Sequence, residues 1–313
     1  MPNEAVPSLA DLVTGEKRVL AAALAAIEIA ADSDALAQLL DDACAAARAH
    51  VVGLTGPPGV GKSTLTNGLV ARARAGNRTV GVIAVDPSSR RTGGALLGDR
   101  ARIVTDPNDR GVYVRSMAAR DRLGGLSNET VAAMVLMRAI YDRVIVESVG
   151  IGQSEADISF CADTVVLCVQ PGSGDSLQFM KAGVMELPDI VVVTKADMTD
   201  AARRARADVE GALTLVAAKP GWQVPVLPVA AARGEGVAEL DAAIEHHHAF
   251  LGDRDRLDAQ RRAQEEFWVD EAIRSHFGTT GIAATRRHDH GAGDGPFTKR
   301  IAILRKLASR LDS

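Results

Sequence analysis

One segment constrains the fold of this chain more than any other, because it matches the pattern G-x-x-x-x-G-K-[ST] in a strand–loop–helix context. It follows the apolar run 51–54 and consists of Gly56, Pro57, Pro58, Gly59, Val60, Gly61, Lys62, Ser63 and Thr64. Such glycines let backbone N–H groups turn inward around a phosphate, and the following helix adds its positive dipole end. The pattern predicts that Lys62 contacts the β- and γ-phosphates and that the Ser63 hydroxyl binds Mg²⁺.

Short apolar runs alternate with segments that favour helices between His50 and about residue 250. The runs lie at 51–54, 80–85, 112–114, 144–146, 164–169, 190–193 and 224–229. Runs without polar alternation suit strands that are covered on both faces. Helices between such strands favour right-handed crossovers. The sequence therefore predicts an α/β fold with a doubly wound, mostly parallel sheet of the P-loop NTPase type.

Two helical extensions flank this segment. Residues 1–48 are predicted to be an N-terminal helical extension, 49–250 the P-loop domain and 251–313 a C-terminal helical arm. In the first extension, Ser33 and its neighbouring aspartates are expected to cap a helix. In the arm, the charged stretch 253–277 carries apolar points such as Phe267 and Trp268, so we expect another surface to cover that side.

Composition excludes several classes of function. Of the 313 residues, 47 % are hydrophobic and 24 % charged, which allows a large core. The net charge of −4 lacks the basic excess of a nucleic-acid binder, and no apolar run is long enough to span a membrane. Three widely spaced cysteines make a poor disulfide framework, and we read the run 19–27 as an amphipathic helix, so a reducing cytoplasm is expected.

A second signal concerns the base. The run 190–193 leads into Thr194-Lys195-Ala196-Asp197, and Asp197 can accept both the N1–H and the N2 amine of guanine. Adenine would leave that carboxylate unpaired, so the sequence predicts a preference for GTP over ATP. The stem of Lys195 is expected to cover the base, and Thr194, in place of the commoner Asn, to loosen the loop. A backbone N–H for guanine O6 is expected from Ala230, Ala231 and Ala232.

Acidic residues follow the strands near the predicted phosphate site. Asp86, Asp99 and Glu147 are candidates for holding Mg²⁺ and orienting the attacking water, although a helix cap or a surface ion pair is the alternative for each. The N–H of Gly150 is expected to sense a γ-phosphate. Because no residue stands in the place of a catalytic glutamine, we expect slow intrinsic hydrolysis that a partner accelerates.

Longer segments carry a resemblance to a known family. VDPSSRRTGGALLGDR (85–100), ESVGIGQSEAD (147–157), PGSGDSLQFMKAG (171–183) and DIVVVTKAD (189–197), with GPPGVGKST, closely resemble the GTPase chaperones of adenosylcobalamin-dependent methylmalonyl-CoA mutase. These belong to the SIMIBI class of P-loop GTPases, and older names include arginine kinase and lysine/arginine/ornithine transport ATPase.

The resemblance implies a protein that binds the mutase, gates cofactor loading and protects or reactivates the enzyme. It implies GTP or GDP and Mg²⁺ as ligands, no metal cluster of its own, and a homodimer formed through the C-terminal helices. It assigns phosphate and Mg²⁺ roles to Lys62 and Ser63, and catalytic or Mg²⁺-linked roles to Asp86, Asp99 and Glu147. The loop 171–183 would be an additional switch toward the mutase, with Asp175, Gln178 and Lys181.

Other functions stay open at this point. A nickel-insertion GTPase predicts an organised Cys/His site, which the sequence does not show. A small-molecule kinase would tolerate ATP, and the Thr194–Asp197 signal argues against it. A nucleotide-binding protein without turnover is the third alternative. The triplet His246-His247-His248 invites a metal site, but consecutive helical residues point in different directions, and we read the triplet as solvated surface.

Overall fold

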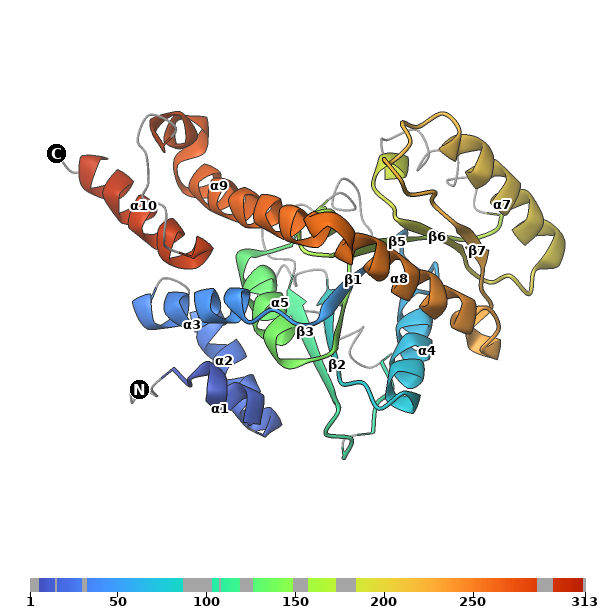
Figure 1. Ribbon diagram of the computed structural model, residues 1–313, viewed down its shortest axis with the longest axis horizontal. Coiled ribbons are helices and arrows are strands. Elements are labelled where there is room, and N and C mark those ends of the chain that lie inside the picture. The colour runs from blue at the N-terminus through green and yellow to red at the C-terminus, as the bar shows by residue number, and fades with distance from the viewer. Residues whose placement is uncertain are drawn as a thin grey trace.

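The sheet of the computed structural model has seven parallel strands in the order β3-β2-β4-β1-β5-β6-β7 (Figure 1). The structure describes residues 6–14, 16–29, 33–86, 103–106, 108–118, 126–148, 157–172, 184–285 and 295–311. The strands are β1 (His50–Thr55), β2 (Val80–Asp86), β3 (Val112–Ala118), β4 (Arg143–Glu147), β5 (Thr164–Val169), β6 (Ile190–Val193) and β7 (Val226–Pro228). The predicted α/β fold with a parallel sheet is confirmed.

Each predicted apolar run overlaps a strand. Strands β5 and β6 have the predicted bounds, whereas β7 is three residues long instead of six. Pro225 and Pro228 border or end this edge strand, and proline has no N–H to give to a ladder. The short β7 therefore follows from backbone chemistry that a hydrophobicity pattern does not register.

Helices cover both faces of the sheet. They are α1 (Leu9–Thr14), α2 (Lys17–Ile29), α3 (Asp34–Ala45), α4 (Lys62–Ala75), α5 (Asn128–Ile140), α7 (Thr199–Leu213), α8 (Val237–Gly252), α9 (Arg256–Thr285) and α10 (Pro296–Leu311). Residues of α4 and α8 share one buried cluster with Val52 and Leu54 of β1. Residues of α2, α3 and α5 share the opposite cluster with Val51. Successive residues of β1 thus face opposite layers, as a doubly wound sheet requires.

The N-terminal extension is helical, as expected. The backbone N–H of Leu36 donates to Oγ of Ser33 at 3.2 Å, so Ser33 caps α3 as the sequence indicated. Helix α10 packs against both α3 and α9, and Figure 1 shows it beside them at one end of the molecule. At its start, the N–H groups of Phe297 and Thr298 each donate to the Asp41 carboxylate at 2.9 Å.

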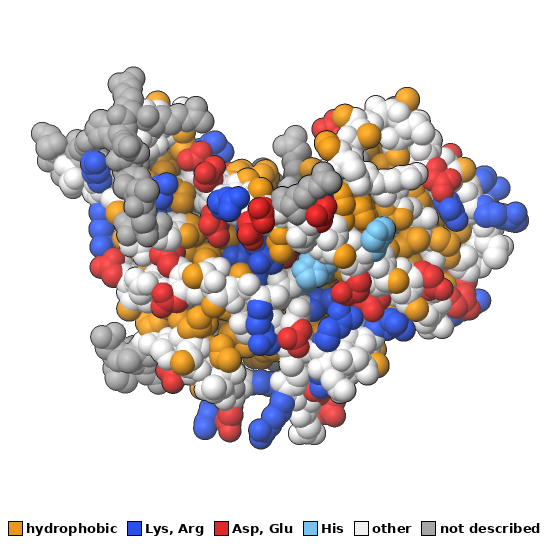
Figure 2. All heavy atoms as spheres, in the orientation of Figure 1, with side chains coloured by type: hydrophobic (Ala, Val, Ile, Leu, Met, Phe, Trp, Pro, Cys, Tyr) orange, Lys and Arg blue, Asp and Glu red, His pale blue; other side chains and the backbone are white. Residues whose placement is uncertain are grey.

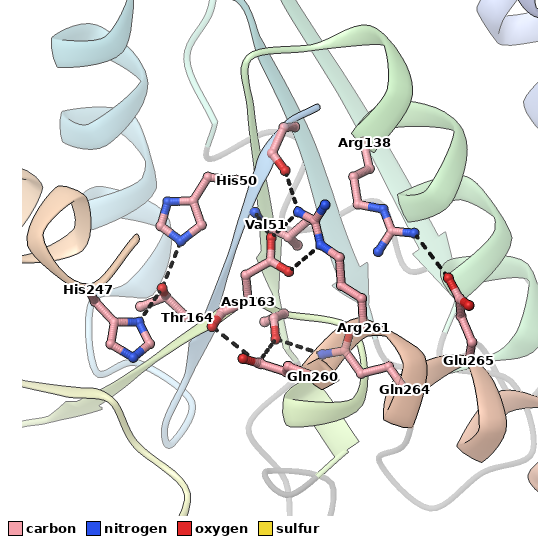
Figure 3. Close-up of polar contacts among 12 residues, drawn as sticks. His50, Val51, Arg138, Asp163, Thr164, His247, Gln260, Arg261, Gln264 and Glu265 are labelled. Carbon is pink, nitrogen blue, oxygen red and sulfur yellow. Dashed lines mark hydrogen bonds and ion pairs between the residues drawn. The ribbon is translucent and has the colours of Figure 1, made fainter. Parts of the chain in front are cut away.

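Helix α9 is attached to the sheet by a polar seam that sequence reasoning did not foresee (Figure 3). Gln260, Gln264 and Trp268 recur every four residues, so they lie on one face of the helix. Gln264 Nε2 donates to the carbonyl oxygens of Ser159 (3.0 Å) and Ala162 (2.9 Å), at the short 3₁₀ helix η2 (Asp157–Phe160) and just after it. Trp268 Nε1 donates to the carbonyl of η2's last residue at 2.7 Å.

The same seam covers apolar surface of the arm. The ring of Phe267 stacks on Phe160 with centroids 3.6 Å apart, and Trp268 is buried in the core shared with α5. The covering surface that we expected for α9 is thus supplied, along this face, by the chain itself. Among the described helices, α9 included, none combines the length and apolar character that crossing a bilayer would require.

Candidate functional site

The predicted phosphate loop joins β1 to α4 in a conformation that depends on glycine. Gly56, Gly59 and Gly61 have φ values of 135°, 74° and 109°, in the region that side chains disfavour. A Cβ on Gly56 would lie 2.2 Å from the carbonyl oxygen of Cys168 in β5, so the loop rests directly on the sheet. The loop ends where α4 begins at Lys62, which places a helix N-terminus beneath it.

Lys62 lies within this loop. Its side chain is 93 % buried (7 % exposed), and Nζ donates to the carbonyls of Gly56 (2.8 Å) and Pro57 (3.2 Å). The ammonium is therefore held at the concave side of the loop by two neutral acceptors. Phosphate oxygens carry full negative charge and form stronger charge-assisted bonds than carbonyls do, so a triphosphate can replace them. This position fits the predicted role of Lys62.

The predicted Mg²⁺ residues of the described chain lie at the same edge of the sheet. Ser63 Oγ donates to Glu147 Oε1 at 2.8 Å, and Glu147 is the last residue of β4, beside β1. Asp86 ends β2 and is 1 % exposed. Hydroxyl and carboxylate oxygens are the ligands that Mg²⁺ prefers, so the donor set fits this ion. Among the described residues, no group of three or more His, Cys, Asp or Glu could hold a metal ion.

The base-recognition loop reaches the phosphate loop. Lys195 has a positive φ of 51°, and its Nζ donates to the Gly59 carbonyl (3.1 Å) and to Gln170 Oε1 (2.7 Å). Thr194 is buried, and its Oγ1 donates to the Val169 carbonyl at 3.0 Å. This bond ties the start of the loop to β5, and a looser loop than one with Asn at this position stays a prediction.

Asp197 lies at the rim of this site with a partner that the sequence did not indicate. Arg233, in the short helix η4 (Ala231–Arg233), lies 3.5 Å from Asp197 Oδ2. The N–H of Ala230 donates to the Glu235 carbonyl at 3.0 Å, so a donor for guanine O6 would come from the two alanines that follow. The first N–H of this loop is thus already bonded within the chain.

Some predicted site residues lie outside the described residues, namely Asp99, Gly150, Asp175, Gln178 and Lys181. Conversely, sequence reasoning missed Thr66, whose Oγ1 donates to Glu147 Oε2 at 3.1 Å, and Arg233. The signal for Thr66 was its spacing, since residue 66 lies one turn after Ser63 and hence on the same face of α4. No local pattern pointed to Arg233.

The interpretation of the histidine triplet is partly wrong. His247 is 2 % exposed and contacts Thr164, whereas His246 is exposed. A cavity of about 940 Å³ lies beside His246, between α7, β7 and α8, and Figure 2 shows hydrophobic side chains gathered on that side. Its lining contains no residue of the phosphate loop. The geometry of the loop, rather than the size of this cavity, therefore locates the nucleotide site.

Several proteins of known name are similar in sequence to most of this chain. A protein of Pyrococcus horikoshii that carries the name GTPase is 47 % identical over 234 residues, 72 % of each chain. A protein of Mycobacterium tuberculosis, also named as a GTPase, is 41 % identical over 246 residues, 76 % of this chain and 71 % of that one. The mouse protein named methylmalonic aciduria type A homolog, mitochondrial, is 37 % identical over 237 residues, 73 % of this chain and 57 % of that one.

Solved structures share the fold. The crystal structure of a LAO/AO transport system kinase covers 100 % of both chains with a TM-score of 0.70 and 26 % identity. HypB from Helicobacter pylori, solved with nickel, covers 69 % of this chain with a TM-score of 0.51, and at 17 % identity it shows the fold alone. The family model described as methylmalonyl Co-A mutase-associated GTPase MeaB matches residues 20–285. With that match over most of its length, the chain belongs to the MeaB family of P-loop GTPases.

Proposed function

We propose that this chain is a Mg²⁺-dependent GTPase that acts as a chaperone of adenosylcobalamin-dependent methylmalonyl-CoA mutase. One observation carries the nucleotide part: Lys195 of the base-recognition loop is bonded to Gly59 of the phosphate loop, so both loops border one crevice. Family membership supports the mutase as the partner. We further propose that the protein gates cofactor loading and protects or reactivates the mutase.

In this proposal each residue has a physical task. Inward-facing N–H groups of 56–64 bind the phosphates, and Lys62 exchanges its two carbonyl acceptors for β- and γ-phosphate oxygens. When bound, Mg²⁺ would neutralise charge on the phosphates, held by Ser63 with Glu147 and Asp86. Asp99 and Gly150 complete the set as the residues that we propose to orient water and sense the γ-phosphate. Asp197 accepts from guanine after Arg233 moves away.

The test of nucleotide recognition is a comparison of GTP, ATP and xanthosine triphosphate binding. Asp197→Asn should weaken GTP binding by about 100-fold or more, because the amide NH₂, which only donates, replaces a carboxylate oxygen that accepted from guanine, so two donors face each other. The variant should gain affinity for the xanthine nucleotide. Asp200→Asn is the matched control, since Asp200 lies three residues further on, exposed at the start of α7. Equal binding of GTP and ATP by the unaltered protein would contradict the assignment.

The test of the partner is GTP hydrolysis with and without purified methylmalonyl-CoA mutase. We expect a slow basal rate that the mutase increases. Alanine at Asp175, Gln178 or Lys181 should reduce this increase more than it reduces the basal rate, because we propose that 171–183 signals to the mutase. Neither binding nor acceleration would leave the chaperone role without support.

Assembly is a separate part of the proposal. We propose a homodimer formed through the arm 251–313, with 1–48 and 49–250 as the helical extension and the GTPase domain. One face of α9 is engaged with η2, so the dimer would use other faces of the arm. Light scattering after size-exclusion chromatography, with and without nucleotide, measures the mass directly. A cytoplasmic location stays a prediction from cysteine usage.

A further inference from the structure

The Glu147 carboxylate is held at both of its oxygens by hydroxyl groups of one helix. Ser63 Oγ donates to Oε1 at 2.8 Å, and Thr66 Oγ1 donates to Oε2 at 3.1 Å. Thr66 is 0 % exposed and Glu147 is 2 % exposed. The hydroxyl of a helical threonine often bonds to a carbonyl one turn earlier, whereas that of Thr66 reaches across to β4. A buried carboxylate at the end of β4 thus accepts hydrogen bonds from two side chains of α4.

The hydrogen bonds of the two hydroxyls to Glu147 should respond differently when nucleotide binds. The proposed function places Ser63 in the Mg²⁺ site, so its lone pairs face the ion and its geometry changes with the ligand. Thr66 lies one turn deeper in α4, and its contact with Oε2 needs nothing from the nucleotide. Of the two hydroxyls that contact Glu147 in the described structure, Thr66 is therefore the one that can hold it in the same rotamer before and after the ion arrives.

A carboxylate that is free to rotate about its last bond can turn its plane away from a neighbour. Thr66 restricts this rotation, because it engages one oxygen, Oε2, and so keeps the other, Oε1, directed at Ser63. Groups that orient the ligands of a metal ion typically contribute 10- to 100-fold to metal affinity or activity. We infer that Thr66 is a positioning residue that fixes Glu147 Oε1 toward the Mg²⁺ site, an inference that rests on the proposed function.

The experiment measures the Mg²⁺ concentration that half-maximally slows release of a fluorescent GDP analogue, in Thr66→Val and in Thr66→Ser. Valine keeps the shape but removes the donor, so this concentration should rise about 10- to 100-fold. Serine keeps the donor and should restore a value within about threefold of the unaltered protein. GDP affinity in EDTA should change less than twofold in both variants. Thr130→Val is the matched control, since Thr130 is a buried helical threonine of α5.

Three results would overturn the inference. These are an unchanged Mg²⁺ dependence in Thr66→Val, a Thr66→Ser variant that behaves like valine, and an equal loss of affinity in EDTA. A double variant gives an independent check: once Glu147→Gln is present, Thr66→Val should add nothing to the Mg²⁺ dependence. If Thr66→Val does not fold, Thr66→Ala, which leaves room for a water to donate, should show the same direction with a smaller shift. Failure of the unaltered protein to bind any guanine nucleotide would instead defeat the proposed function.

Discussion

A chain of hydrogen bonds at the amino-terminal edge of the sheet makes stability depend on pH. His50 Nε2 and His247 Nδ1 each lie 2.7 Å from Thr164 Oγ1, and His247 Nε2 lies 3.4 Å from Asp189 Oδ1 (Figure 3 shows the first two contacts). Thr164 has a single hydroxyl proton, so it donates to one imidazole and accepts from the other. With His247 Nε2–H directed at Asp189, Thr164 donates to His247 Nδ1, and His50 Nε2–H donates to Thr164.

This assignment leaves His50 Nδ1 as a bare lone pair. Among the described residues it has no hydrogen-bond partner, so a proton there would be buried without an acceptor. Burial lowers the pKa of His50 well below its ordinary value, and the positive charges of His248, Arg143 and Arg261 lower it further. Burial also lowers the pKa of His247, with Lys219 adding to the effect and Asp189 and Asp163 opposing it.

The sign and size of the effect follow from proton linkage. An unfolded histidine has a pKa of about 6.5, so between pH 7.5 and 5.5 the unfolded chain gains nearly one proton at residue 50. The native state gains less of a proton there, because its His50 pKa is depressed well below that value. Acid therefore favours unfolding. The free energy of unfolding is unaffected by the titration of His50 above about pH 7, and it decreases as the pH falls through the unfolded pKa of about 6.5. The loss at pH 5.5 is on the order of 1 kcal/mol from His50 alone.

The assay is urea unfolding, followed by circular dichroism at pH 7.5 and pH 5.5. His50→Gln keeps an N–H donor near the position of Nε2 and does not titrate, so it should lose about 1 kcal/mol less than the unaltered protein between the two pH values. His246→Gln is the control, because His246 is exposed. Only the difference between the two pH values matters, so a general destabilisation by glutamine does not disturb the comparison. Equal losses in His50→Gln and the unaltered protein would refute the reasoning.

Three other changes test the packing of the fold. Arg261→Met should destabilise the fold by about 3 kcal/mol or more, because the fully buried Asp163 carboxylate loses two hydrogen bonds of 2.9 and 2.7 Å. Adding Asp163→Asn should restore part of the melting temperature. A fully additive loss in the double variant would contradict this account. Gly53→Ala should lower the free energy of unfolding by about 1–3 kcal/mol, since the added Cβ would lie 2.6 Å from a side-chain carbon of η2. An unchanged melting temperature would contradict this and would mean that η2 can shift to make room. Cys161 and Cys168 should react with a thiol reagent only on unfolding, because burial raises the pKa of both thiols, that of Cys168 to about 12. Mass spectrometry of the native protein after treatment with the reagent should find neither cysteine labelled.

The carboxyl edge of the sheet could be predicted because its signals are local. The spacing of the glycines in 56–64 indicates the phosphate loop, and the structure explains it, because these glycines have positive φ values. The apolar run before Thr194 marks the end of a strand. Parallel strands bring such ends to one edge, which is why two loops more than 130 residues apart border one crevice. Apolar runs also placed the strands, since strands covered on both faces need no alternation.

Residues that act through a distant partner could not be predicted in the same way. Arg233 lies in a turn without any charge pattern, and its contact with Asp197 exists only because β6 and β7 are neighbours. His247 looked like surface because its neighbours in sequence are histidines, yet helical geometry turns it toward β5 and buries it. In both cases the deciding information is the strand order, which single-sequence patterns do not contain.

Changes at the two edges of the sheet should consequently affect different properties of this molecule. At the carboxyl edge, Lys62 and Glu147 are held by bonds that a nucleotide and its ion can replace, so changes there should alter ligand handling. At the amino edge, Asp163 binds Arg261 of α9 and the N–H of Val51 in β1 at once, so changes there should alter how firmly the arm is attached. Turn η2 also holds the arm, because the carbonyls of Ser159 and Phe160 accept from Gln264 and Trp268 of α9.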